Sequence, residues 1–370
     1  MKKGSDKRIK TPSMLIRKCS TRRHNSFYRN IDRVIGMLIL LLAIGPAMEA
    51  QNNATPNIIF ILADDLGYGD LSCYGQKHFR TPNIDKLAQQ GIRFTNHYSG
   101  SPVCAPSRSA LMTGLHTGHT FVRGNKEVRP EGQWPLPDEA YTLTEMLKSS
   151  GYVTGVFGKW GLGYPGSEGA PQNQGVDTFF GYNCQRLAHN YYPEYLWDNQ
   201  NKVVLAGNTG TSKGDYAPGK IHTRALQFLD DNKDTSFFLF YPMIIPHAEL
   251  FAPEKYMAIY RGKFLPEKTF DGVDAGEKDF RNGPYGSQPE SHAAFAAMIH
   301  LMDEQVGSIL NKIHELGLDE NTLILFSSDN GPHLEAGADP DYFDSNGILR
   351  GYKRDLYEGG MRVPMIARWT

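Results

Sequence analysis

The stretch NIIFILADD, residues 57–65, decides how the chain folds. Residues 57–63 form a mainly apolar run that is rich in Ile. A short apolar run of this kind predicts the central strand of a parallel sheet, covered by helices on both faces. Asp64 and Asp65 follow at the carboxyl end of this strand. The sheet and its most interesting chemistry are therefore expected to meet at this point.

Outward from this stretch, apolar runs alternate with amphipathic segments. The patterns predict helices at 83–90, 142–149, 221–231 and 291–316, and strands at 93–95, 152–157, 237–243, 322–328 and 363–368. Two regions with little periodicity, 164–219 and 250–290, are interpreted as long loops, the first with a hairpin near 197–205. Strands that alternate with helices indicate an α/β fold with right-handed crossovers and a mostly parallel sheet.

Polar side chains follow four of the predicted strands. They are Asp64 with Asp65, Lys159, His247, and Asp329 with Asn330. In such sheets, ligands bind outside the carboxyl ends of the strands. We therefore expect these side chains to share one site.

A second informative stretch is CAPSRSALMTG, residues 104–114. Pro106 suits a first helical turn and Gly114 suits the end of a helix. Cys104 would then lie at a helix N-terminus, where an anion is favoured, with Arg108 about one turn further on. From these residues alone, a buried structural Cys beside a solvated Arg is an equal alternative.

The whole run closely resembles the Cys-x-Pro-Ser-Arg-x-x-x-x-Thr-Gly signature of the type I sulfatases. Related blocks are Gly-Lys-Trp at 158–160, Pro246-His247, and the run at 350–364. The resemblance implies an alkaline-phosphatase-like α/β fold, with the mostly parallel sheet between two layers of helices. It also implies that a dedicated enzyme oxidises Cys104 to formylglycine (3-oxoalanine), whose hydrated aldehyde is the nucleophile.

The oxygen-bearing pairs suit a hard cation. Asp64, Asp65, Asp329 and Asn330 offer only oxygen ligands, which favours Ca²⁺ over Mg²⁺. An Asp-Asp pair alone is a weak signal, which an N-cap and a turn would also explain. The resemblance implies that these four residues bind one Ca²⁺ together with residue 104.

The same resemblance assigns the other site residues. Arg108, Lys159 and Lys353 would stabilise charge on the sulfuryl oxygens, and His247 with Lys353 would protonate the departing alcohol. The implied reaction is attack of residue 104 on sulfur, followed by release of sulfate. Without the resemblance, each Lys would be a solvated charge and His247 a loop residue bonded to backbone.

One position departs from the family pattern. The family usually has Gly-Lys-Trp-His-Leu-Gly, but this chain has Gly161 in place of the His. The resemblance implies that this His serves the second step, the release of sulfate, so either another group takes the proton here or residue 104 acts without a fixed base. His189 is a candidate replacement or substrate contact. Further candidates near the site, which surface turns would explain equally well, are His116, His119, Arg123 and His333.

The aromatic-rich loop at 191–197 could form a rim for sugar rings, or a hydrophobic cluster that holds the loop. Together with the export that the N-terminal segment predicts, this loop favours a sulfated carbohydrate as substrate over a small aryl sulfate. Two alternatives stay open: a phosphatase or phosphodiesterase of the same superfamily, and an inactive carbohydrate-binding relative.

Charge and composition separate the N-terminus from the rest. The chain has 370 residues and a net charge of -1, but residues 1–50 hold 11 Lys and Arg against 3 acids. A basic region, the apolar run 34–43 and small residues up to Ala50 predict a cleaved export signal, favoured over an uncleaved anchor. The expected location is the periplasm or outside the cell. The sequence contains no basic patch of the kind that would favour nucleic-acid binding.

Residues 51–370 are then expected to form the catalytic domain, with a formylglycine-generating or anaerobic maturating enzyme as partner. The chain ends inside a predicted strand, so the small C-terminal subdomain of the family is expected to be missing. Cys73 and Cys184 could pair, but free thiols are favoured because two Cys make no disulfide framework.

Overall fold

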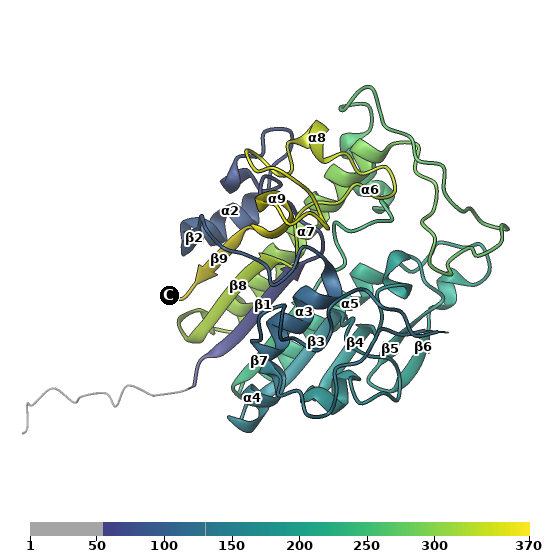
Figure 1. The fold of residues 1–370 in the computed structure, drawn as a ribbon. Helices are drawn as coiled ribbons and strands as arrows, with labels where there is room; N and C mark the ends of the chain where they lie inside the picture. Colours follow the sequence, from purple (N-terminus) through teal and green to yellow (C-terminus); the bar gives the residue numbers. More distant parts are fainter. Residues whose placement is uncertain (1–54, 130) are drawn as a thin grey trace, which may run out of the picture. The chain divides into compact units, whose positions relative to one another are not determined.

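The computed structural model describes residues 55–129 and 131–370, and the predicted export signal at 1–50 lies outside them. The described residues form a nine-stranded sheet with the order β2-β9-β8-β1-β7-β3-β4-β5-β6 (Figure 1). Its central strands, β8 (Thr322–Ser328), β1 (Asn57–Ala63), β7 (Phe237–Pro242), β3 (Val153–Lys159) and β4 (Thr178–Tyr182), are parallel. The α/β fold with a mostly parallel sheet is therefore confirmed.

Antiparallel strands complete both edges of the sheet. They are β2 (Ile92–Phe94) and β9 (Met365–Arg368) beyond β8, and β5 (Tyr195–Asp198) and β6 (Asn201–Val204) beyond β4. The last two form the predicted hairpin. The predicted first strand lies at the centre of the sheet, between β8 and β7.

Helices cover both faces because the side chains of β1 alternate between two cores. Ile59 and Ile61 face one core, which includes α2 (Pro82–Gln89), α5 (Ala217–Asp231) and α7 (Ser291–Glu315). Phe60 and Leu62 face the other core, which includes α3 (Cys104–Thr113) and α4 (Leu143–Ser149). Period-two alternation in a strand buried on both faces produces this three-layer arrangement.

Three α-helices and one β-strand were not predicted. β4 lies in the region interpreted as a loop, and α6 (Glu254–Tyr260) lies in the second such region. α5 also begins at Ala217, four residues before the predicted start. Two short helices, α8 (Pro340–Phe343) and α9 (Glu358–Met361), lie in the segment between β8 and β9.

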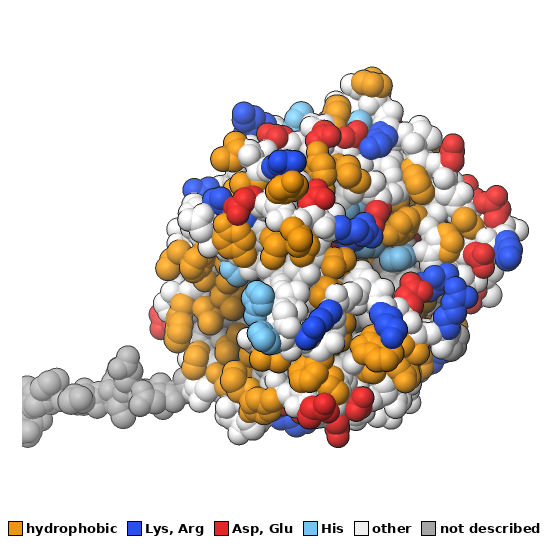
Figure 2. Space-filling model, in the orientation of Figure 1, with side chains coloured by type: hydrophobic (Ala, Val, Ile, Leu, Met, Phe, Trp, Pro, Cys, Tyr) orange, Lys and Arg blue, Asp and Glu red, His pale blue; other side chains and the backbone are white. Residues whose placement is uncertain are grey.

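Hydrophobic side chains gather at the edge formed by β2 and β9 (Figure 2). An apolar groove of about 700 Å³ opens beside this edge, lined among others by Tyr98, Leu111, Leu115, Met361 and Met365. Among the described helices, none has the length and apolar character needed to cross a bilayer. Cys73, Cys104 and Cys184 are free thiols. The prediction that Cys73 and Cys184 form no disulfide is therefore confirmed.

Candidate active site

The predicted polar residues converge at the carboxyl edge of the central strands. Asp64 and Asp65 leave the end of β1, and both carboxylates contact Cys104 at the start of α3. Consecutive residues of an extended strand point to opposite faces. Asp65 instead adopts a left-handed φ of 63°, which Asp tolerates better than most residues. This turn lets two neighbouring carboxylates face the same point.

The Sγ atom of Cys104 lies 3.5 Å from Asp64 Oδ1 and 3.7 Å from Asp65 Oδ1. Burial raises the pKa of the Cys104 thiol well above its usual value, although Lys159 and Lys353 act in the opposite direction. A buried neutral thiol is a poor nucleophile. The geometry therefore suits chemistry at position 104, but not chemistry of an ordinary thiolate.

Two cations from different elements bind the acidic residues on one side. Arg108 donates to Asp329 Oδ2 from Nε at 3.0 Å and from Nη2 at 2.8 Å, and also to the carbonyl of Lys159. Lys159, the last residue of β3, donates to Asp64 Oδ2 at 2.6 Å. All four side chains are buried. Burial raises the pKa of Asp64, but Lys159, Arg108 and Lys353 outweigh this effect and leave it below the usual value.

Lys353 binds the acidic residues on the other side. Its Nζ donates to Asp65 Oδ2 at 2.8 Å and to Glu335 Oε2 at 2.9 Å. Nε2 of His247 lies 3.5 Å from Asp65 Oδ2, while its Nδ1 bonds to the carbonyl of Ala248. Burial lowers the pKa of His247 well below its usual value, with the charges of Lys353 and Lys159 adding to the effect. His247 is therefore neutral at pH 7 and has one ring nitrogen turned toward the site.

The oxygen ligands fit a hard cation. Asn330 donates from Nδ2 to Asp65 Oδ1 at 2.6 Å, and its Oδ1 is buried without a hydrogen-bond partner. A buried oxygen without a partner is costly unless it binds a ligand. Burial and the charge of Asp64 also raise the pKa of Asp329 to about 7, so added positive charge would favour its ionised form. Carboxylate and amide oxygens of this kind suit Ca²⁺.

A cavity of about 170 Å³ adjoins these groups. His189, His247, Tyr285, Glu335 and Lys353 line it, together with Asn125, Glu127, Gln133, Gln185 and Arg354. The ring of His189 stacks on that of His247, with centroids 5.3 Å apart, and its Nδ1 bonds to the carbonyl of Gly283 at 2.7 Å. Burial lowers the pKa of His189 to about 4, so the imidazole is neutral. The predicted substrate contact thus lies in the wall of this cavity.

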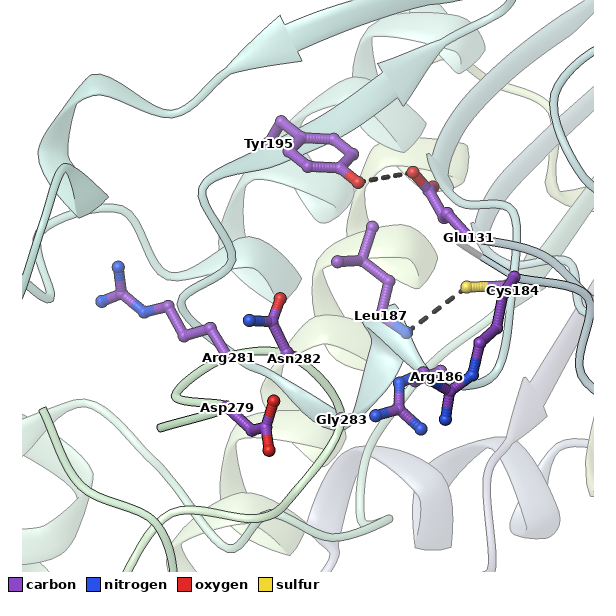
Figure 3. Close-up of a pocket in the computed structure, with 10 residues that line it drawn as sticks. Glu131, Cys184, Arg186, Leu187, Tyr195, Asp279, Arg281, Asn282 and Gly283 are labelled. Carbon is purple, nitrogen blue, oxygen red and sulfur yellow. Dashed lines mark hydrogen bonds between the residues drawn. The ribbon is translucent and has the colours of Figure 1, made fainter. Parts of the chain in front are cut away.

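Residues of the segment 184–187 also line a second, larger cavity of about 520 Å³ (Figure 3). In Figure 3 the Tyr195 hydroxyl points at Glu131, with Arg186 and Arg281 on opposite sides of the cavity. Arg186 also pairs with Glu127 of the smaller cavity at 3.2 Å. The walls of the two cavities are therefore in direct contact.

The aromatic loop contains a buried part and a part that faces a cavity. Tyr191 is fully buried, and its hydroxyl donates to the carbonyls of Ile244 and His247. Tyr192 packs against Tyr216. Tyr195 alone among the loop's aromatic residues lines the larger cavity. The first half of the loop is therefore a structural cluster, and only its second half faces a cavity.

Three of the four further candidates lie apart from the cluster. His116, His119 and Arg123 are exposed, and His116 lines the apolar groove instead. His333 is buried and bonds to the carbonyl of Pro246 at 3.3 Å. Surface turns therefore account for the first three, whereas His333 packs against His247.

Sequence reasoning missed Glu335, Arg354, Tyr285 and Gln185. Glu335 joins Lys353 to Arg354, whose Nη2 lies 2.5 Å from Glu335 Oε1. Tyr285 comes from the irregular region 250–290, and Gln185 from the loop after β4. None of these residues stands in a recognisable pattern. Only the distance of Glu335 from His333, two residues, could have suggested its place.

Comparison with known proteins places this geometry in a family. A family model described as Sulfatase matches residues 56–370. Human arylsulfatase A is 35% identical over 356 residues, and dog N-acetylgalactosamine-6-sulfatase is 30% identical over 348 residues. Each alignment covers 90% of this chain. The chain spans 62% and 60% of the length of these two relatives.

A solved structure shows the same similarity in three dimensions. The structure of Ps i-CgsB in complex with k-i-k-neocarrahexaose is 30% identical, with a TM-score of 0.69. The superposition covers 85% of this chain and 66% of that chain. The alkaline-phosphatase-like arrangement expected from the sequence is thus shared with a protein solved in complex with a carbohydrate.

Proposed function

Because the chain belongs to the type I sulfatases of the alkaline-phosphatase superfamily, we propose that it hydrolyses sulfate esters. The observation that carries this proposal is the position of Cys104. Its side chain meets two carboxylates and lies within a ring of buried cations. A site of this kind can bind one anionic group and stabilise the charge that develops on it.

Residue 104 is proposed to act as formylglycine. The raised pKa of the Cys104 thiol supports this, because a neutral thiol lacks the nucleophilic strength that the reaction needs. A hydrated aldehyde supplies hydroxyl groups at the same place. The conversion requires a formylglycine-generating or anaerobic maturating enzyme as a partner.

The proposed cofactor is one Ca²⁺, held by Asp64, Asp65, Asp329 and Asn330. The unpartnered Oδ1 of Asn330 and the crowding of the carboxylates support it. Such an ion polarises bound oxygen atoms and lowers the pKa of hydroxyl groups. Mg²⁺ suits this set of residues less well, because it demands near-ideal octahedral geometry.

Four side chains are proposed to bind the sulfuryl group and to protonate the departing alcohol. Arg108, Lys159 and Lys353 are proposed to bind the sulfuryl oxygens, since their charged groups surround residue 104. His247 holds its Nδ1 on the Ala248 carbonyl and presents Nε2 to the site. A bound anion favours the imidazolium form, so His247 can donate a proton to the departing alcohol, assisted by Lys353.

The proposed substrate is a sulfated carbohydrate. Relatives named N-acetylgalactosamine-6-sulfatase and a structure with k-i-k-neocarrahexaose support this class. The larger cavity supports it too, because Arg186, Glu131 and other polar groups suit a hydroxyl-rich ligand better than a plain aryl group. The sequence pattern of residues 1–50 supports export, so the substrate would be met outside the cytoplasm.

Mass spectrometry and kinetics test the proposal together. After co-expression with a maturating enzyme, the peptide that contains residue 104 should weigh about 18 Da less than its Cys form. The matured chain should release sulfate from sulfated mono- or oligosaccharides, and Cys104→Ala should reduce kcat/KM by at least about 10³-fold. Activity on phosphate esters alone, or equal activity of Cys104→Ala, would contradict the proposal. Activity confined to aryl sulfates would contradict only the carbohydrate substrate.

A further inference from the structure

The side chain of Gln185, from the loop after β4, fills the space beside Gly161. Gly161 has a φ of 77°, and a Cβ atom added there would lie 2.2 Å from Nε2 of Gln185. The same point lies 3.7 Å from Cδ of Arg108. The carboxamide of Gln185 therefore occupies the position that a side chain at 161 would take, next to the stem of Arg108.

This carboxamide has no partner in the described part of the protein. Gln185 is 4% exposed, and neither Nε2 nor Oε1 makes a hydrogen bond. Its backbone N–H donates to Gln133 Oε1 at 3.3 Å, which fixes the residue in place. Buried amide groups are almost always satisfied, so this amide is free to bind a water molecule or a ligand. Gln185 lines the small cavity together with His247 and Lys353.

We propose that Gln185 binds the sulfuryl group of the substrate, with Nε2 donating a hydrogen bond to a sulfuryl oxygen. The inference rests on the proposed sulfatase function and names a further residue of that site. The sulfuryl group is the favoured partner because the Gln185 amide and the Arg108 stem both border the space beside Gly161, and because Lys353 lines the same small cavity as Gln185. The amide adds a donor without adding charge, and it does not titrate, so its contribution is independent of pH.

Binding measurements test this assignment without relying on turnover. The parent is Cys104→Ala, saturated with Ca²⁺, and the probes for calorimetry are inorganic sulfate and a sulfated monosaccharide. Adding Gln185→Leu, which keeps the size but removes the amide, should weaken both affinities about 10- to 100-fold. Gln185→Glu should weaken them further, because a carboxylate repels the anion.

The matched control is Gln174→Leu in the same parent. Gln174 is also fully buried with an unpartnered Oε1, but its side chain donates to the Glu168 carbonyl, away from both cavities. This variant should lower thermal stability and leave both affinities unchanged. A Gln185→Leu variant that behaves in the same way would overturn the inference.

The remaining outcomes separate the two proposals. Loss of affinity for the sulfated sugar with unchanged affinity for inorganic sulfate would overturn the assignment, because Gln185 would then bind the sugar. A parent that binds no sulfate would overturn it as well. Sulfate binding that depends on Gln185, in a matured chain that cleaves no sulfate ester, would support the inference and contradict the proposed function.

Discussion

Arg108 connects two strand ends of the site. Its guanidinium binds Asp329 after β8 and the carbonyl of Lys159 at the end of β3. The planar fork of Arg makes these bonds in fixed directions, which a single ammonium cannot reproduce. Arg108 therefore positions two strand ends as well as supplying charge.

The substitution Arg108→Lys should keep the charge and lose this geometry. We expect kcat/KM of the matured chain to fall about 10²-fold, since one charge-stabilising group is misplaced. Steady-state kinetics on the best sulfated sugar measures the effect. Arg224→Lys is the control, because Arg224 pairs with Asp198 at the surface and should leave the kinetics unchanged. Equal kinetics for Arg108→Lys and the native chain would refute the positioning role.

Asp70 is a buried acid outside the site. It accepts the N–H of Gly67 at 2.7 Å, and its Oδ1 is buried without a partner. Burial raises the pKa of Asp70 from 3.8 to about 7. A raised acid pKa means that the folded state binds more protons between these two values, so Asp70 destabilises the fold progressively as pH rises through this window.

Asp70→Asn should remove this pH dependence. At pH 4 the variant and the native chain should be equally stable, and at pH 8 the variant should be more stable by up to about 4 kcal/mol. Chemical denaturation at both pH values measures the difference. A variant that gains nothing between pH 4 and pH 8 would show that Asp70 is not held in its neutral form.

The residues of the site were predictable only where a pattern marked them. Asp64, Asp65 and Asp329 follow strands, and the resemblance identified Lys159 and Lys353. Glu335 and Gln185 lie in loops without periodicity. Only the packing of distant segments brings Glu335 to Lys353 and leaves the Gln185 amide without a hydrogen-bond partner. For the same reason, three exposed side chains near Cys104 in sequence looked equally promising.

At the level of elements, glycines allow β3 to approach β7 and β4 to approach β3. A Cβ at Gly158 would lie 1.9 Å from the carbonyl oxygen of Pro242 in β7, and one at Gly181 would lie 2.0 Å from that of Gly158. Both glycines also have positive φ, of 139° and 155°. The strand that ends in Lys159 therefore depends on the absence of a side chain one residue earlier.

Gly158→Ala should push β3 away from β7. We expect the free energy of unfolding to fall by about 3 kcal/mol or more, because backbone atoms cannot yield as a flexible side chain can. Gly114→Ala is the comparison, since Gly114 has a φ of 67° but open space around it. That variant should lose only about 1 kcal/mol from strain. Similar losses for both, measured by denaturant unfolding, would show that contact is not the main cost.

The elements that sequence analysis missed are short and poorly marked. β4 has five residues and contains Gly181, which weakens a strand pattern. α6 has seven residues inside a region rich in Pro and Gly. By contrast, the long stripe of α7 and the apolar runs of β1 and β8 were predicted with nearly correct bounds, because burial dictates their composition.

At the scale of the whole molecule, the site is formed by residues spread along most of the chain, from Asp64 to Lys353. A ligand that binds these segments only when they are folded stabilises the entire domain. Thermal unfolding should therefore respond to Ca²⁺. At free Ca²⁺ near 100 times Kd, the gain is about 2.7 kcal/mol.

The measured quantity is the Tm of chelator-treated protein with and without Ca²⁺. The expected rise of several degrees should vanish in Asp329→Ala and persist in Asp230→Asn, a surface carboxylate paired with Lys312. An equal rise with Mg²⁺ at the same concentration would contradict the preference for Ca²⁺.

The buried ion pairs have a consequence for the order in which ligands arrive. The carboxylates of Asp64, Asp65, Asp329 and Glu335 face the cationic groups of Arg108, Lys159, Lys353 and Arg354, so their formal charges cancel. An incoming anion finds little net attraction in such a balanced cluster. With a divalent cation bound, two positive charges would be in excess and would attract an anion such as the proposed sulfate ester. We therefore expect the cation to bind first and the anion second, an order that follows from the charges of the side chains.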